Sequence, residues 1–84
     1  MKAVPNWSKR ARTIFRTFKF EGFLNAIAFV DRIARKAQKI NHHPDIDIRW
    51  RKVTLRLVTH SVGGYVTDKD LTLAHKIDSI VHEL

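Results

Sequence analysis

The chain has 84 residues, no cysteine and 44% hydrophobic residues. This size and composition fit one compact domain over residues 1–84 and exclude a two-domain protein, a disulfide scaffold and thiol chemistry. No stretch approaches the roughly 18 consecutive apolar residues of a membrane helix, so we expect a soluble, cytoplasmic protein whose formal net charge is +8.

The positive charge is concentrated in the first half of the chain. Residues 1–39 hold ten basic and two acidic side chains, a net of +8, whereas residues 40–84 hold six of each sign. Clustered cations attract phosphates at long range, so this half suits nucleic acid or an anionic ligand. It is equally consistent with a solvated face that keeps a small oligomer soluble. An Arg-rich start also occurs in transit peptides, but the apolar alternation that follows favours a folded strand.

The first half predicts strands followed by a long helix. Apolar side chains alternate over residues 11–20 and predict a strand. A short strand over residues 6–10 is predicted before it, with Ser8–Arg10 as its turn. A helix is predicted next, because three- and four-residue steps separate the apolar residues Phe23, Ala26, Ile27, Val30, Ile33, Ala34 and Ala37. Leu24 and Phe29 lie off that stripe. Because that helix is apolar on more than one side, we expect it to contact both its own sheet and a second subunit.

A constrained loop and a hairpin follow the helix. Pro44 ends the helix and forces His43 into an extended conformation. Alternating apolar residues then predict a β-hairpin over residues 46–59, with its turn at Arg51–Lys52. His60 is predicted to close the second strand, on the face opposite the apolar side chains.

The last helix has three start signals that agree. Thr67 is a good N-cap, Asp70 at the third helical position completes a capping box, and Val66 with Leu71 suits a hydrophobic staple. The buried stripe of this helix is predicted to extend to Leu84. The predicted fold class is α+β, with a four-stranded antiparallel sheet and two main helices packed on one face.

Three of the five histidines are expected to converge. A hairpin that turns the chain back can bring His60 beside His42 and His43. Three imidazoles suit acid-base catalysis, because the reference pKa of imidazole is about 6.5. Metal binding and structural hydrogen bonding stay open, although adjacent histidines on an extended chain point to opposite faces, which makes joint ligation awkward. His75 and His82, on the last helix, are interpreted as surface residues.

Several motifs follow one another along the chain: Ile14 to Phe20 running into Phe23 and Phe29, then Asn41-His42-His43-Pro44-Asp45, Trp50, Thr59-His60, Gly64, and Thr67 to Asp70 followed by Leu73-Ala74. In this order and at these spacings they resemble the pterin-4a-carbinolamine dehydratase family. The resemblance covers nearly the whole chain from about Trp7, and the His-His-Pro triplet alone would be a weak sign of it. By this resemblance we expect a short member of the family that lacks the usual amino-terminal helix.

The resemblance implies a function and an assembly. It implies four antiparallel strands flanked by helices, with chains paired edge to edge into homodimers and often into homotetramers through the long helices. It also implies dehydration of 4a-hydroxytetrahydropterin to quinonoid dihydropterin, a step of tetrahydrobiopterin recycling, with no metal and no other cofactor. By the same resemblance, His42 and His60 are the acid-base candidates for the two faces of C4a, and His43 binds and orients the pterin.

The resemblance also assigns the substrate-binding residues, which are Thr59, Ser61, Trp50, Asp70 and Gln38. Backbone groups of the segment from Thr59 to Ser61 are expected to hydrogen-bond the pyrimidine edge of the pterin. Gln38 departs from the family, because relatives often carry an acidic residue at this position. Glutamine can hydrogen-bond but cannot raise the pKa of a histidine by charge, so we expect slower catalysis or a lower pH optimum.

Two other classes of function remain. Some eukaryotic relatives bind a homeodomain transcription factor and stabilise its dimer, so the alternative is a protein-binding module with weak or no catalysis. The basic first half of the chain is the only independent support for that role. Nucleic-acid binding ranks third, and no membrane partner is expected.

Overall fold

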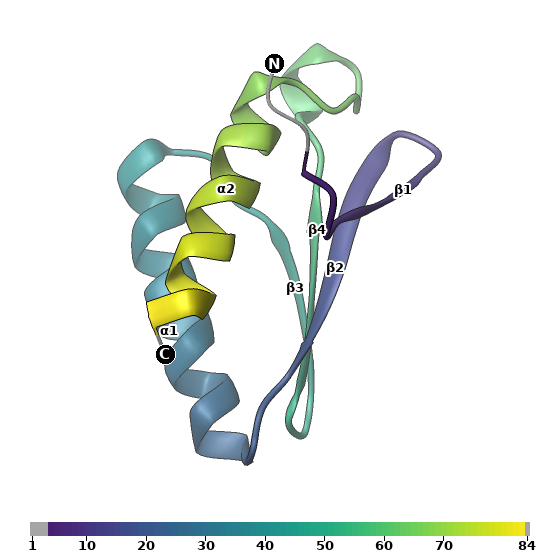
Figure 1. Cartoon of the computed structure of the whole chain (residues 1–84). Helices are drawn as coiled ribbons and strands as arrows, with labels where there is room; N and C mark the ends of the chain where they lie inside the picture. Colours follow the sequence, from purple (N-terminus) through teal and green to yellow (C-terminus); the bar gives the residue numbers. More distant parts are fainter. Residues whose placement is uncertain (1–3, 84) are drawn as a thin grey trace.

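A computed structural model describes residues 4–83 of the chain. In chain order its elements are β1 (Ser8–Arg10), β2 (Thr13–Lys19), α1 (Phe23–Ile40), β3 (Asp45–Arg49), β4 (Lys52–Leu57), the 3-10 turn η1 (His60–Val62) and α2 (Asp68–Glu83). The strands form one antiparallel sheet in the order β1-β2-β4-β3, and both helices lie over the same face of it (Figure 1). The predicted α+β fold is confirmed. Leu84, at the end of the predicted stripe of the last helix, lies outside the described residues.

The core lies between the two helices and the sheet face that they cover. Alternation along β2 and β4 places apolar side chains on this face in register, with Ile14 opposite Leu57 and Phe18 opposite Val53. The helices supply the other half, with Ala26, Phe29, Ile33 and Ala37 buried on α1 and Leu73, Ala74, Ile77 and Ile80 on α2. Phe29, which lies off the predicted stripe of α1, is fully buried, whereas Phe23 and Ile27 of that stripe are 50% and 37% exposed. The apolar periodicity therefore predicted the buried face of α2, but it placed the buried face of α1 only in part.

Two phenylalanines of α1 offer a matched test of this packing. Phe29 is fully buried, and its ring centroid lies 5.0 Å from that of Phe18 and 4.9 Å from that of Phe20. Phe23 is 50% exposed. We expect Phe29→Ala to lower the free energy of unfolding by about 3–5 kcal/mol, and Phe23→Ala to lower it by about 1 kcal/mol or less. Urea denaturation followed by circular dichroism measures both, and equal losses would contradict the burial of Phe29.

The first hairpin turn lies three residues later than predicted. Ser8–Arg10 forms β1 itself, because Arg10 pairs with Thr13. The loop consists of Ala11 and Arg12, and Ala11 has a positive φ of 54°. A short first strand is present as predicted, but it covers Ser8–Arg10 rather than residues 6–10 and so occupies the predicted turn.

The second hairpin turn is also displaced, by one residue. Arg49 pairs with Lys52, so the loop is Trp50 and Arg51 rather than Arg51–Lys52. Trp50 has a φ of 57°. Tight two-residue hairpin loops need a positive φ to match the strand twist, and glycine, asparagine and aspartate are the usual residues there. Because alanine and tryptophan are not turn signals, the sequence gave no sign of either position.

Some apolar surface stays uncovered within one chain. On α1, Phe23 is 50%, Leu24 77% and Ile27 37% exposed. Ile46 and Ile48 are 38% and 36% exposed on β3, which is an edge strand.

Among residues 4–83, no helix is both long enough and apolar enough to span a bilayer.

Candidate active site

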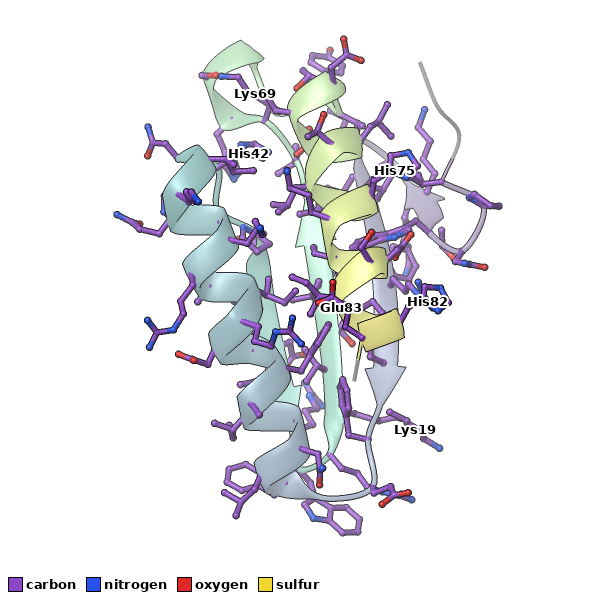
Figure 2. The ribbon with its side chains drawn as sticks, turned by 60° about the vertical axis from the view of Figure 1, so that its left-hand side comes forward. Lys19, His42, Lys69, His75, His82 and Glu83 are labelled. Carbon is purple, nitrogen blue, oxygen red and sulfur yellow. The ribbon has the colours of Figure 1, made fainter. Side chains whose placement is uncertain are left out.

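A hollow of about 340 Å³ opens near one end of the sheet, where α1 ends and α2 begins. Figure 2 shows His42 and Lys69 at this end of the molecule. The residues that line the hollow are Asn41, His42, His43, Val58, Thr59, His60, Ser61 and Lys69. The three histidines expected to converge therefore border one concave surface. The volume falls within the range of about 300–1,000 Å³ that small-molecule pockets occupy.

The end of α1 sets the position of the histidine pair. Asn41 takes the left-handed conformation, with φ 54° and ψ 44°, and the backbone N–H of His42 donates to the Ala37 carbonyl at 3.1 Å. A residue in the left-handed conformation, followed by such a backbone hydrogen bond, commonly ends a helix. Asparagine adopts this conformation more readily than most residues. Pro44 follows His43 and leads directly into β3 at Asp45. Both histidines thus lie on a connection fixed at each end.

A fully buried carboxylate lies behind the first histidine. Asp70 Oδ1 is 2.6 Å from His42 Nε2, while Asp70 Oδ2 accepts from the Thr59 hydroxyl at 2.7 Å and from the Thr67 backbone N–H at 2.8 Å. Thr67 Oγ1 in turn accepts from the backbone N–H of Lys69 at 3.3 Å. The predicted capping box is therefore confirmed. Asp70 is 0% exposed and contacts His42 and Thr59, and its predicted contact with substrate stays a prediction.

This contact fixes the tautomer of His42. An ionised carboxylate only accepts hydrogen bonds, so the hydrogen between the two groups lies on His42 Nε2. In the neutral ring, Nδ1 then keeps its lone pair and can accept a proton, and once protonated it can donate one. Asp70 is therefore a positioning residue for His42.

The second histidine has a neutral partner. Gln38 Oε1 lies 2.8 Å from His43 Nε2, and both residues are exposed. Because an amide oxygen only accepts, His43 donates through Nε2 and keeps the lone pair on Nδ1. Gln38 does not line the hollow. Its contact with His43 differs from the predicted contact with substrate.

The third histidine is not on a strand, contrary to the prediction. β4 ends at Leu57, and His60 begins η1. The side chain of His60 is exposed, and among residues 4–83 it has no ion pair or side-chain hydrogen bond. His60 therefore reaches the hollow from a turn rather than from the sheet.

The loop that carries His60 is closed by backbone bonds and glycines. Thr59 N–H donates to the Tyr65 carbonyl at 2.9 Å, and Gly64 N–H donates to the Thr59 carbonyl at 3.2 Å. Gly63 and Gly64 have φ of 85° and 83°, a conformation that residues with a Cβ rarely adopt. Arg12 holds the loop from outside, since its guanidinium lies 4.4 Å from the centroid of the Tyr65 ring.

These contacts decide which of the predicted binding groups are available. The backbone groups of Thr59 are used within the loop, and its hydroxyl donates to Asp70 and is bonded to Thr67 at 2.7 Å. Thr59 is 3% exposed, so it positions the site more than it can bind a ligand. Ser61 lines the hollow and is exposed. Of the predicted segment, His60 and Ser61 remain as the groups that can meet a pterin.

Trp50 is not brought to the hollow within one chain. It lies in the β3–β4 turn, 70% exposed, with the Arg51 guanidinium 5.2 Å from its ring centroid. That turn is at the opposite end of β4 from the hollow (Figure 1). A six-residue strand spans about 20 Å, too far for one side chain to reach across.

Sequence reasoning missed three of the lining residues. Asn41, Val58 and Lys69 border the hollow, but none was selected as a site residue. For Lys69 a signal existed, because the capping box places it in the first turn of α2, next to Asp70. Among the described residues that line the hollow, Lys69 is the one lysine or arginine, so it brings a full positive charge to this surface.

The other two histidines lie on α2, away from the hollow, as Figure 2 shows. His82 is exposed as predicted, but His75 is only partly exposed, and its Nε2 is buried without a hydrogen-bond partner in the described chain.

Among residues 4–83, there is no group of three or more histidine, cysteine, aspartate or glutamate side chains that could hold a metal ion.

Relatives with known names share the sequence and the fold. The family model described as pterin 4 alpha carbinolamine dehydratase matches residues 1–80. A protein of Nocardia farcinica named "Putative pterin-4-alpha-carbinolamine dehydratase" is 49% identical over 80 residues, covering 95% of this chain and 83% of the relative. A protein of Roseiflexus sp. with the same name is 52% identical over 78 residues, covering 93% and 83%.

Two solved structures are also similar. A transcriptional coactivator/pterin dehydratase from Brucella melitensis superposes with a TM-score of 0.84 at 35% identity, covering 89% of this chain and 81% of that one. A pterin dehydratase-like protein identified as a RuBisCO assembly factor in the alpha-carboxysome gives 0.75 at 20% identity, covering 89% and 88%, and shows the shared fold alone. The length of the family match and the identity to its members lead to one conclusion: this chain belongs to the pterin 4 alpha carbinolamine dehydratase family.

Proposed function

We propose that the chain dehydrates 4a-hydroxytetrahydropterin to quinonoid dihydropterin by histidine acid-base catalysis. The observation that carries this proposal is the hollow in which three imidazoles of a pterin dehydratase family member meet. One of these imidazoles is backed by a fully buried carboxylate, the arrangement that orients a catalytic histidine.

The reaction asks for two proton transfers. The bond between C4a and its hydroxyl oxygen breaks, and a proton from a general acid lets the hydroxyl leave as water. A base takes the proton from N5 while a double bond forms between C4a and N5. Groups that change protonation near neutral pH perform both transfers well, and positioned acid-base groups typically contribute about 10²- to 10⁴-fold in rate.

The three histidines differ in how they are held, which supports different roles. His42 is tied to Asp70, so its ring has one orientation and one tautomer. His60 is exposed, so it can exchange its proton with water after each turnover. We assign these two residues to the acid-base pair for C4a and N5. His43, bonded to Gln38, binds and orients the pterin.

The first experiment is a turnover measurement. Purified protein is added to 4a-hydroxytetrahydropterin generated by an aromatic amino-acid hydroxylase, and the decay of that intermediate is followed by its absorbance. We expect the rate of decay to rise in proportion to the protein concentration. No acceleration at micromolar protein would favour the protein-binding role instead.

Gln38→Glu tests the neutral partner of His43. A carboxylate at this position would favour the charged imidazolium. We therefore expect the alkaline limb of the pH-rate profile to move to higher pH in the variant. Gln38→Ala is the matched control, because it removes the hydrogen bond without adding charge. An unchanged profile in Gln38→Glu would show that His43 does not titrate during turnover.

A second candidate function is protein binding, with or without catalysis. The uncovered apolar side chains of α1 and the open edge of β3 favour it, because exposed apolar patches on a small chain mark interfaces. We propose that copies of this chain cover them in a homodimer or homotetramer. The name of the Brucella melitensis relative includes the words transcriptional coactivator, and a different protein is therefore a second type of partner to test.

A further inference from the structure

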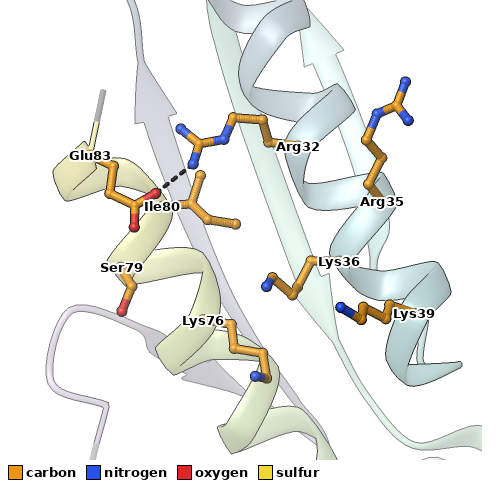
Figure 3. Close-up of a pocket in the computed structure, with 8 residues that line it drawn as sticks. All are labelled: Arg32, Arg35, Lys36, Lys39, Lys76, Ser79, Ile80 and Glu83. Carbon is orange, nitrogen blue, oxygen red and sulfur yellow. Dashed lines mark hydrogen bonds and ion pairs between the residues drawn. The ribbon is translucent and has the colours of Figure 1, made fainter.

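A larger hollow, of about 520 Å³, lies between the two helices. It is lined by Arg32, Arg35, Lys36, Lys39, Lys76, Ser79, Ile80 and Glu83 (Figure 3). None of these residues lines the histidine hollow. The groove thus has five basic side chains from two helices and one acidic side chain, and it plays no part in the proposed chemistry.

The two arginines are already paired, but the three lysines are not. Arg32 pairs with Glu83, and Arg35 Nε lies 3.0 Å from Asp31 Oδ2. Within residues 4–83, Lys36, Lys39 and Lys76 form no ion pair with a carboxylate. Lys36 and Lys39 are three residues apart on α1, so their charges are neighbours and repel each other.

The lysines face one another across the groove. Figure 3 shows the ammonium groups of Lys36 and Lys39 turned toward α2 and that of Lys76 turned toward the gap from the other side. Three convergent cations without counter-charges form a favourable place for an anion that carries several charges. Ser79 adds a hydroxyl that can donate to the same anion.

We propose that this lysine groove binds a small molecule that carries two or more phosphate groups, and that it recognises the phosphates. No aromatic side chain is among the lining residues, and the one apolar lining residue, Ile80, is 6% exposed. The groove therefore offers nothing on which a nucleobase could stack. Its volume suits a small ligand, and the Glu83 carboxylate, which also lines the groove, disfavours a continuous polyanion.

The test is calorimetric titration of the full chain at fixed ionic strength with inorganic tripolyphosphate and, separately, with ATP. We expect saturable binding of both, with dissociation constants that agree within about threefold, because only the phosphates are recognised. Binding that is absent up to about 10 mM would overturn the proposal. ATP that binds more than about tenfold tighter than tripolyphosphate would show a base-recognition site instead.

Matched variants separate this groove from general charge attraction. Lys36→Gln/Lys39→Gln should weaken tripolyphosphate binding by at least about tenfold. Lys19→Gln/Lys52→Gln removes the same charge from a cross-strand pair outside the groove and should leave binding within about twofold. Equal weakening of tripolyphosphate binding in both variants would overturn the proposal. Circular dichroism verifies that each variant is folded, and dehydratase turnover should be unchanged in all of them.

Discussion

Replacing His42 with alanine is expected to lower the acceleration of 4a-hydroxytetrahydropterin dehydration by about 10²- to 10⁴-fold. The ring is held against Asp70 and borders the hollow, so its removal takes away the proton transfer that we assign to it. The measurement is the same turnover assay, at saturating substrate and several pH values. His42→Ala also removes a partner of buried Asp70, so we expect the free energy of unfolding to fall by about 1–3 kcal/mol.

His60→Ala separates catalysis from stability. The His60 side chain is exposed and makes no side-chain hydrogen bond among the described residues, so its removal should leave the unfolding curve unchanged while turnover falls by about 10²-fold. His82→Ala is the matched control, because His82 is an exposed histidine of α2 outside the hollow. Turnover that stays at the unmodified level in both His42→Ala and His60→Ala would exclude the acid-base pair that we assign.

Asp70→Asn is expected to have the second large effect, through His42. An asparagine that keeps accepting from Thr59 and Thr67 must turn its NH₂ group toward His42 Nε2, which then has to accept. The hydrogen of the neutral ring moves to Nδ1, the wrong tautomer for a base. We expect turnover to fall by about 10²-fold, and ¹⁵N chemical shifts of the imidazole to report the tautomer directly.

Two further variants complete the test of Asp70, one that measures its contribution to stability and one that controls for its charge. Asp70→Ala leaves three donors without their acceptor and should lower the free energy of unfolding by about 3–5 kcal/mol. Asp31→Asn removes the same charge from an exposed carboxylate of α1 and should leave turnover unchanged. A normal rate in Asp70→Asn, with the imidazole shifts of the unmodified protein, would show that Asp70 does not select the tautomer.

The helices were the best predicted part of the fold, because their signals are local. The apolar steps from Phe23 specified α1, and the capping box of Thr67 and Asp70 specified the start of α2. Both hairpin turns were displaced, since Ala11 and Trp50 take positive φ values that their side chains do not favour. Such a conformation is imposed by the pairing of the strands on either side, which no local pattern records.

For the candidate site, the convergence of the histidines followed from strand geometry, but their partners did not. The two ends of a hairpin lie side by side, so the sequence could place His60, after the second strand, near His42, before the first strand. The capping box revealed one hydrogen bond of Asp70, yet the contacts with His42 and Thr59 join segments far apart in the chain. Trp50 does not reach the hollow within one chain, because the β3–β4 turn lies at the end of β4 that is away from the hollow.

The most direct test of the central claim is a crystal structure of the protein with a bound dihydropterin. We predict that the heterocycle fills the hollow between α1 and η1, with nitrogen atoms of His42, His43 and His60 all within about 3.5 Å of it. A dihydropterin that binds elsewhere, or that sits in the hollow with C4a and N5 turned away from His42 and His60, would contradict the account.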